Sequence, residues 1–112
     1  MKLSNFKILA PLAAAAFLMG ATSGQTITVK GSDTMVVMAQ RWAEAYMAKH
    51  PGTTIQVTGG GSGTGISALI NGTTDICNSS RPMKSAERAK LQERYATLGI
   101  EIKSAKDGLS VY

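Results

Sequence analysis

The chain has 112 residues, with 12 Lys and Arg, 7 Asp and Glu, and a formal charge of +5. This length allows one domain at most, and the charge is far below the dense Lys/Arg stripe of a nucleic-acid-binding protein. The single cysteine, Cys77, excludes an internal disulfide, and with the single histidine, His50, it makes no plausible metal site.

Residues 1–23 have the pattern of a secretory signal peptide. Lys2 and Lys7 form a positive start, residues 8–20 are mostly apolar, and small residues fit a cleavage site after Ser23. The apolar stretch is too short to span a bilayer, and no cysteine follows it for lipoprotein acylation. We therefore expect an exported mature chain, and the loss of Lys2 and Lys7 lowers the formal charge from +5 for the full sequence to +3 (10 basic minus 7 acidic residues).

The mature chain alternates strand-like and helical patterns. Period-two alternation and β-branched residues mark the strands, and apolar spacings of three to four residues mark the helices. The predicted strands cover residues 26–30, 53–57, 74–78, 100–104 and the start of another at 109–112, and the predicted helices cover 35–50, 65–70 and 86–97. This order predicts an α/β fold with a mostly parallel sheet and flanking helices.

The helices also show faces and ends. In the first helix, His50 precedes a proline and so ends the helix. Ser85 is expected to be the N-cap of the last helix, and Gly99 its C-terminal stop. Spacing of i, i+4, i+7 and i+8 predicts one buried face in the first helix, made of Met38, Trp42, Ala45 and Tyr46.

Three loops follow the carboxyl ends of predicted strands, where parallel sheets bind ligands. They read "GSDT" at 31–34, "GGGSGTG" at 59–65 and "NSSR" at 78–81. A glycine-rich turn that opens a helix directs N–H donors and a positive dipole end at one spot, and Arg81 could add a forked cation. Hydroxyl donors come from Ser32, Thr34, Ser62, Thr64, Ser79 and Ser80. With no nucleophile–base pair beside them, the loops favour capture of a small tetrahedral oxyanion over catalysis.

Two alternatives stay open from the residues alone. Ser32 and Asp33 could simply cap the first helix, and the glycines could form a loop without a ligand. Gly63-x-Gly65-x-x-Ala68 also satisfies the loose dinucleotide pattern, which would make the chain a secreted Rossmann-like enzyme domain. A nicotinamide titration separates that reading from anion capture.

The stretches "GSDTM" at 31–35 and "GGGSGTGISALINGTTDICNSSRPM" at 59–83 resemble the periplasmic phosphate-binding proteins of phosphate ABC transporters, over about residues 27–112. The resemblance implies a periplasmic-binding-protein-like lobe in a two-lobed, hinge-closing receptor. Such a receptor traps hydrogen phosphate in the periplasm and delivers it to a membrane permease. It also implies a monomer that is not an enzyme and needs no cofactor or nucleic acid.

Site residues follow from the same resemblance. It implies a hydroxyl from Thr34, a backbone N–H from Met35, a serine at Ser62 and a ligand at Ser80. To these we add Arg81 and, as a further candidate, Ser32.

The position of Ser80 departs from the family pattern. There the best-studied family pattern has an acidic residue that accepts the phosphate proton and so rejects sulfate, whereas Ser80 followed by Arg81 is similar to a shorter-chain branch of the family. In this chain the acceptor would be a serine oxygen, Asp33 or Asp75, so sulfate and molybdate remain alternative ligands.

The length is a second departure from the family. Its members carry a second lobe with a further arginine and a Ser-Gly-Thr donor cluster, which this sequence does not contain. We therefore expect residues 24–112 to form the first part of the first lobe.

The signal-peptide pattern generates a direct prediction about export. The chain should be recovered from the periplasm with its first residue at, or within a residue or two of, position 24. N-terminal sequencing of the exported protein checks this, with the cytoplasmic fraction as control. Recovery of a soluble cytoplasmic pool that retains Met1 contradicts it.

Overall fold

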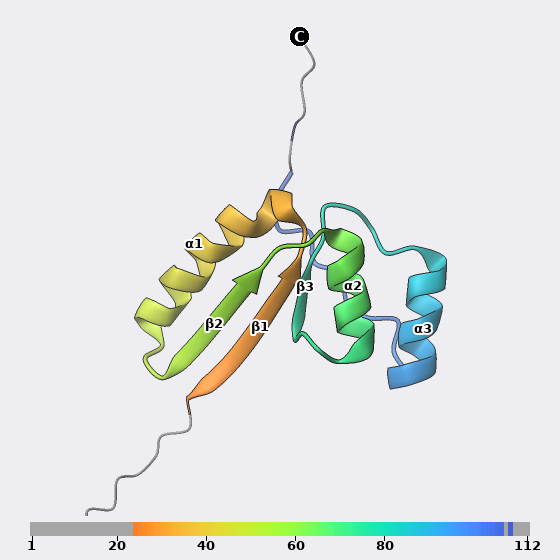
Figure 1. The fold of residues 1–112 in the computed structure, drawn as a ribbon, viewed down its shortest axis with the longest axis horizontal. Coiled ribbons are helices and arrows are strands. Elements are labelled where there is room, and N and C mark those ends of the chain that lie inside the picture. The colour runs from red at the N-terminus through yellow and green to blue at the C-terminus, as the bar shows by residue number, and fades with distance from the viewer. Residues whose placement is uncertain (1–23, 107, 109–112) are drawn as a thin grey trace, which may run out of the picture.

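The computed structural model describes residues 24–106 and 108 of the chain. Strands and helices alternate as β1 (Gln25–Gly31), α1 (Asp33–Lys49), β2 (Thr53–Thr58), α2 (Ser62–Asn71), β3 (Ile76–Asn78) and α3 (Ser85–Tyr95). The α/β class is as predicted (Figure 1). The expected signal peptide and the expected strand at 109–112 lie outside the described residues.

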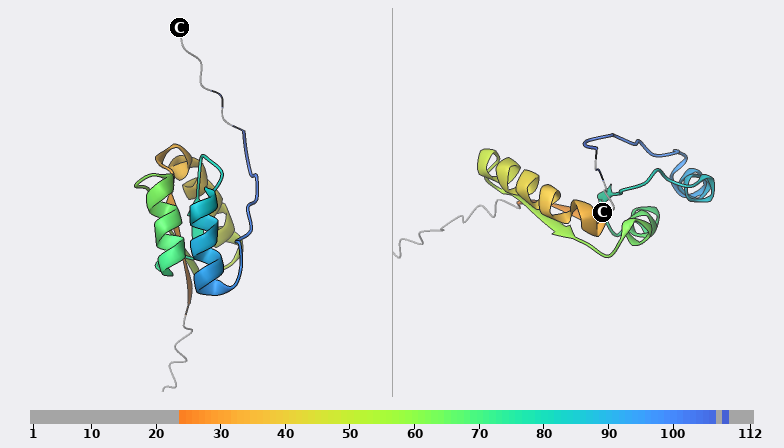
Figure 2. Two further views of the ribbon diagram at one scale, coloured as in Figure 1. Left: turned by 90° about the vertical axis from the view of Figure 1, so that its right-hand side faces the viewer. Right: turned by 90° about the horizontal axis from the view of Figure 1, so that it is seen from above.

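β1 is the central strand of the described sheet, whose order is β2-β1-β3. Both neighbours run parallel to it, and Val29 sits opposite Val57 on one side and Ile76 on the other. The chain moves outward from β1 to β2 and then back across β1 to β3. Because crossovers between parallel strands are right-handed, this reversal places α1 and α2 on opposite faces of the sheet (Figure 2).

α2 packs very closely on the end of β1. Ile66 in its first turns is 1% exposed. At Gly65 an added Cβ would lie 2.5 Å from both Gly31 Cα and the Lys30 carbonyl oxygen. The helix can therefore approach the strand only because this position has no side chain.

The buried face of α1 differs from the predicted one. Ala39 and Ala43 are buried, Met38 is half-buried, and Ala45 is exposed. Trp42 and Tyr46 are 47% and 46% exposed. The small alanines let α1 lie close to the sheet, so the large aromatic rings are turned to its margin. The spacing rule predicted the helix correctly, but the buried stripe is shifted by one residue, from Met38 and Trp42 to Ala39 and Ala43.

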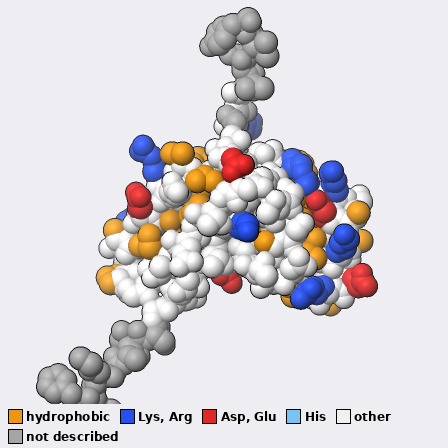
Figure 3. Space-filling model, viewed as in Figure 1, with side chains coloured by type: hydrophobic (Ala, Val, Ile, Leu, Met, Phe, Trp, Pro, Cys, Tyr) orange, Lys and Arg blue, Asp and Glu red, His pale blue; other side chains and the backbone are white. Residues whose placement is uncertain are grey.

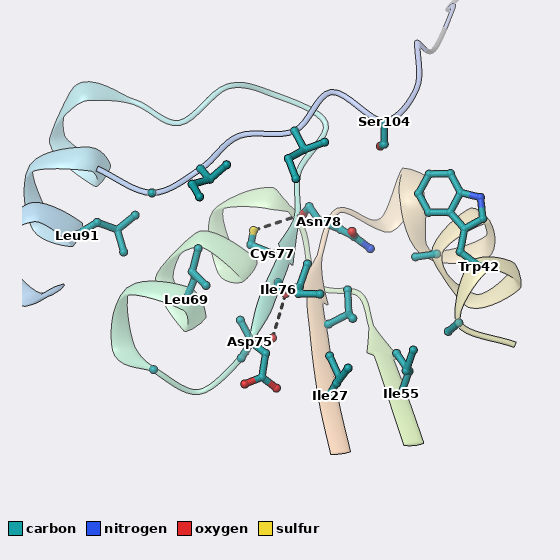
Figure 4. Close-up of a pocket in the computed structure, with 18 of the residues that line it drawn as sticks. Ile27, Trp42, Ile55, Leu69, Asp75, Ile76, Cys77, Asn78, Leu91 and Ser104 are labelled. Atoms are coloured by element: carbon teal, nitrogen blue, oxygen red, sulfur yellow. Dashed lines mark hydrogen bonds between the residues drawn. The ribbon is translucent and has the colours of Figure 1, made fainter. Parts of the chain in front are cut away.

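An apolar cavity of about 1080 Å³ lies on the α1 side of the sheet. Ile27, Ile55 and Ile76, one from each strand, line it together with Trp42 (Figure 4). The same cavity is lined by residues of the segment after α3, including Ile100 and Ile102. The apolar surface of the sheet is thus only partly covered by the described residues.

The expected strand at 100–104 is wrong. Residues 101–106 have no regular secondary structure, and Ile100 and Ile102 are 90% and 84% exposed. Its period-two pattern is correct for a strand, but a strand forms only where another offers hydrogen bonds along its edge. Among the described residues the sheet contains β1, β2 and β3 alone.

The helix ends agree with the sequence in α1 and differ in α3. His50 is the C-cap of α1, and its N–H donates to the Tyr46 carbonyl at 3.0 Å. In α3 the N-cap is Lys84 instead of Ser85, and the helix ends at Tyr95 with Ala96 as its C-cap, at φ 54°, before Gly99 is reached.

Lys and Arg side chains gather over the α3 side of the molecule, with acidic residues between them (Figure 3). α3 buries only Leu91, and the remainder of this helix is polar or exposed. Across the described part of the chain, every helix falls short of the length and apolarity that a membrane crossing requires.

The close approach at Gly65 generates a stability prediction with a matched control. Gly65→Ala should lower the free energy of unfolding by about 1–3 kcal/mol, because its methyl group overlaps the β1 backbone. At Gly63 an added Cβ would meet nothing nearer than Arg81 Nη2 at 3.8 Å. Gly63→Ala should therefore be neutral or stabilising by up to about 1 kcal/mol. Urea unfolding of both variants checks this, and equal midpoints would contradict it.

Candidate functional site

The three loops predicted from the sequence meet at the carboxyl edge of the sheet, and each is hydrogen-bonded to the other two. Gly61 N–H donates to the Gly31 carbonyl at 2.9 Å, and Ser32 N–H donates to the Asn78 carbonyl at 2.8 Å. Ser80 N–H donates to Ser62 Oγ at 3.1 Å. The loops therefore form one connected cluster, and displacement of any one of them would disturb the others.

Asp33 connects the first loop to the glycine run. Its Oδ1 accepts the Gly60 N–H at 2.8 Å. Ser32 occupies the N-cap position of α1, but its side chain makes no capping hydrogen bond. Gly60 and Gly61 have φ values of 117° and 93°, which side chains other than glycine rarely adopt. These two glycines are thus needed for the turn into α2.

Ser62 is the first residue of α2, because this helix begins three residues earlier than predicted. Its Oγ lies 3.1 Å from Ser80 Oγ. The first N–H groups of a helix have no partner within it and carry the positive end of its dipole. The paired hydroxyls therefore sit where the start of α2 favours a negative charge.

Thr34 and Met35 lie in the first turn of α1. Met35 N–H donates to the Ser32 carbonyl at 3.2 Å, a long bond that a ligand would have to replace. Ser32 is 3% exposed, whereas Thr34 and Ser80 are exposed. A groove of about 880 Å³ is lined in part by Thr34, Met35, Ser80 and Arg81. Ser62 is not part of this lining, but its hydroxyl contacts the hydroxyl of Ser80, which is.

Arg81 is paired with Glu87, which sequence reasoning missed. Nη2 donates to Glu87 Oε1 at 2.8 Å and Nη1 donates to Oε2 at 3.0 Å. The hydrogen bond from Arg81, followed by one from Lys84 N–H, lowers the pKa of Glu87 to about 2. Glu87 stands three residues after the N-cap Lys84, but a capping box is recognised in a sequence by Ser or Thr at the N-cap, so the sequence carried no signal for this pair.

Asp75 is separate from the loop cluster. Its Oδ2 accepts the Thr28 N–H at 2.8 Å and the Thr28 hydroxyl at 2.9 Å. Thr28 lies within β1, three residues before that strand ends. These two bonds hold the pKa of Asp75 below its usual value. Of the two carboxylates considered as proton acceptors, only Asp33 stands in the cluster.

Cys77 is half-buried in β3, and burial raises the pKa of its thiol. His50 is at the other end of α1, stacked on Tyr46 with 4.1 Å between ring centroids. Among residues 24–106 and 108, no three His, Cys, Asp or Glu side chains are grouped closely enough to hold a metal ion. What the loops offer is a set of hydrogen-bond donors, two helix N-termini and one paired arginine, which suits binding of an oxyanion.

Comparisons with known proteins found related sequences and related structures. A sequence model described as "PBP superfamily domain" matches residues 19–111. The phosphate-binding protein PstS of Pseudomonas aeruginosa is 33% identical over 82 residues, which are 73% of this chain and 25% of that protein. PstS of Staphylococcus haemolyticus is 34% identical over 82 residues, 73% of this chain and 26% of that protein.

Two crystal structures show the same relationship. A possible phosphate-binding protein from Planctomyces limnophilus has a TM-score of 0.61 and 31% identity, over 62% of this chain and 25% of that one. An ABC-type phosphate transport receptor from Vibrio cholerae has a TM-score of 0.55 and 38% identity, over 56% and 25%. The chain thus spans about a quarter of the length of the relatives it matches.

The lowered pKa of Glu87 generates a prediction about acid stability. A carboxylate with a depressed pKa stabilises the fold above its usual value of 4.5, and this stabilisation is lost as the pH falls towards about 2. Unfolding followed near neutral pH and at about pH 3 should therefore show a larger acid-induced loss in the parent chain than in Glu87→Gln. Glu93→Gln, an exposed change on the same helix, should behave like the parent. If Glu87→Gln lost as much stability in acid as the parent chain, the lowered pKa of Glu87 would be contradicted.

Proposed function

Because the chain belongs to the PBP superfamily, we propose that it is a solute-binding protein which captures inorganic phosphate for an ABC-type importer. In this proposal residues 1–23 direct export to the periplasm, and residues 24–112 are part of the first lobe. The complete receptor is a monomer that delivers its ligand to an inner-membrane permease and catalyses no reaction. The names of the relatives, which are phosphate-binding and phosphate-transport proteins, support this ligand.

The observation that carries the proposal is the cluster of three loops, joined by hydrogen bonds, at the carboxyl ends of three parallel strands. Two helices start there, so backbone N–H groups and dipoles favour an anion at this edge. The hydroxyls of Ser62 and Ser80, 3.1 Å apart, can turn their hydrogens towards a phosphate oxygen. Neutral donors of this kind hold an anion because several hydrogen bonds point at it from fixed directions.

The remaining site residues take secondary roles in the same proposal. Thr34 donates its hydroxyl, and Met35 donates its backbone N–H after releasing the Ser32 carbonyl. Arg81 contributes its guanidinium from the third loop, and Ser32 supports the first loop from its buried position.

The ligand set is dominated by donors, which bears on selectivity. Asp33 has one oxygen engaged by Gly60, and Asp75 is engaged by Thr28. A buried free carboxylate penalises sulfate because sulfate carries no proton to share, and a set of donors does not. We therefore propose only a small preference for phosphate over sulfate.

Phosphate titration of the chain, followed by amide NMR shifts, tests the proposed function. Thr34 and Ser80 are exposed, so a bound anion stays partly hydrated and each donor replaces a water at little net gain. That gain must offset the lost freedom of the ligand, so the expected Kd is about 1 mM or weaker. Shifts should concentrate at Ser62, Gly63 and Ser80, and Ser62→Ala should weaken binding by about twofold, the net worth of one partly hydrated hydrogen bond.

Ser67→Ala is the matched control, because Ser67 is an exposed serine further along the same helix. It should leave the phosphate affinity unchanged, and sulfate should give shifts at the same amides. Phosphate shifts spread over surface lysines, with Ser62→Ala equal to the parent, would contradict the proposed site.

A further inference from the structure

The contact between Arg81 and Glu87 uses only one edge of the guanidinium group. Both Nη atoms face the carboxylate at 2.8 and 3.0 Å, and Nη1 also donates to the Pro82 carbonyl at 3.0 Å. A guanidinium has five N–H groups. Among the described residues, Nε–H and the second N–H of Nη2 have no acceptor. Covalent geometry makes these two parallel, so they form a second fork along the side of the group.

One nitrogen of this side edge, Nη2, lies beside the loop cluster. Arg81 Nη2 lies 3.8 Å from the point where a side chain at Gly63 would begin. Gly63 follows Ser62 in the first turn of α2, and Ser62 Oγ is in contact with Ser80 Oγ. Because Gly63 has no side chain, nothing from this position stands between the guanidinium and the helix start.

Glu87 is itself held in place, so it can fix Arg81. Its Oε2 accepts the Lys84 N–H at 2.7 Å, at the beginning of α3. The side chains of Arg81 and Glu87 are 32% and 20% exposed. A second carboxylate, Glu101, holds the same loop through the Met83 N–H at 2.9 Å. Arg81 is thus anchored by a helix start and does not project freely into solvent.

We propose that Glu87 is a positioning residue of the anion site. By occupying the end edge of the Arg81 guanidinium, it presents the Nε–Nη2 edge for two-point contact with an oxyanion beside α2. It also offsets the charge of Arg81, so the anion is held by directed hydrogen bonds and only weakly by net attraction. The inference rests on the proposed function, because the oxyanion is the phosphate proposed above.

The salt dependence of phosphate affinity tests this role. In the parent chain, raising the ionic strength from about 0.02 to 0.3 M should weaken binding by less than about threefold, because the carboxylate of Glu87 offsets the positive charge of Arg81. In Glu87→Gln the charge of Arg81 is exposed to the ligand, and the same change should weaken binding by about tenfold. The amide of Gln keeps the size of Glu and one acceptor for Lys84 N–H, so the helix start is preserved.

Two variants control for net charge and for the fold. Glu101→Gln makes the same charge change and loosens the same loop, but its partner is Arg88; it should keep the parental salt dependence. The double variant Arg81→Gln/Glu87→Gln restores the parental net charge and should bind weakly with little salt dependence. A salt dependence in Glu87→Gln equal to that in Glu101→Gln overturns the proposal.

A carboxyl titration without phosphate separates this inference from the proposed function. Glu87 should titrate near 2 in the parent and at a clearly higher pH in Arg81→Gln, where only the bond from Lys84 N–H still lowers its pKa. If the parent shows this titration and binds phosphate, but Glu87→Gln keeps the parental salt dependence, only the positioning role is wrong. If the parent gives no phosphate shifts at Ser62 and Gly63, both proposals are wrong, and the titration still reports whether the ion pair forms.

Discussion

The structure depends on the close approach of α2 to the end of β1 at Gly65 and Gly31. A side chain at Gly65 would overlap the strand backbone, so this contact requires glycine. It buries Ile66 and sets the first turn of α2 beside the other two loops. The backbone hydrogen bond from Gly61 to Gly31 then joins the glycine run to the first loop. The donors of the proposed site are therefore positioned by packing of the fold.

Carboxylates organise this site through backbone N–H groups. Asp33 accepts from Gly60, Glu87 from Lys84 and Glu101 from Met83. Each of these bonds fixes a loop that borders the candidate anion site, and Asp75 does the same for the start of β3 through Thr28. A carboxylate that is satisfied in this way has less capacity left to attract a cation or a proton. The negative charges of the chain thus support a site whose ligand is itself negative.

The hydrophobic core of the described residues is small, because its buried apolar residues are mainly alanine, valine and leucine with one fully buried isoleucine. Much of the apolar surface lies on the α1 side of the sheet, where Ile27, Ile55 and Ile76 line an open cavity (Figure 4). The loop cluster, in contrast, is held by polar contacts that do not depend on this face. The order of the site and the coverage of the core are therefore separate features of the fold.

The sequence by itself determined the alternation of strands and helices, the end of α1 at His50 and the three loops that form the site, because these depend on local periodicity and on glycine, serine and proline at particular positions. Only the tertiary structure decided which face of α1 is buried, since Ala39 and Ala43 permit a close approach that Trp42 does not. It also decided that Arg81 pairs with Glu87 and that Asp75 pairs with Thr28, 47 positions away. The segment at 100–104 shows the same limit, because alternation predicts a strand but only a neighbouring strand can pair with it. Local pattern specifies what a segment can become, and the partners brought next to it by folding decide what it does become.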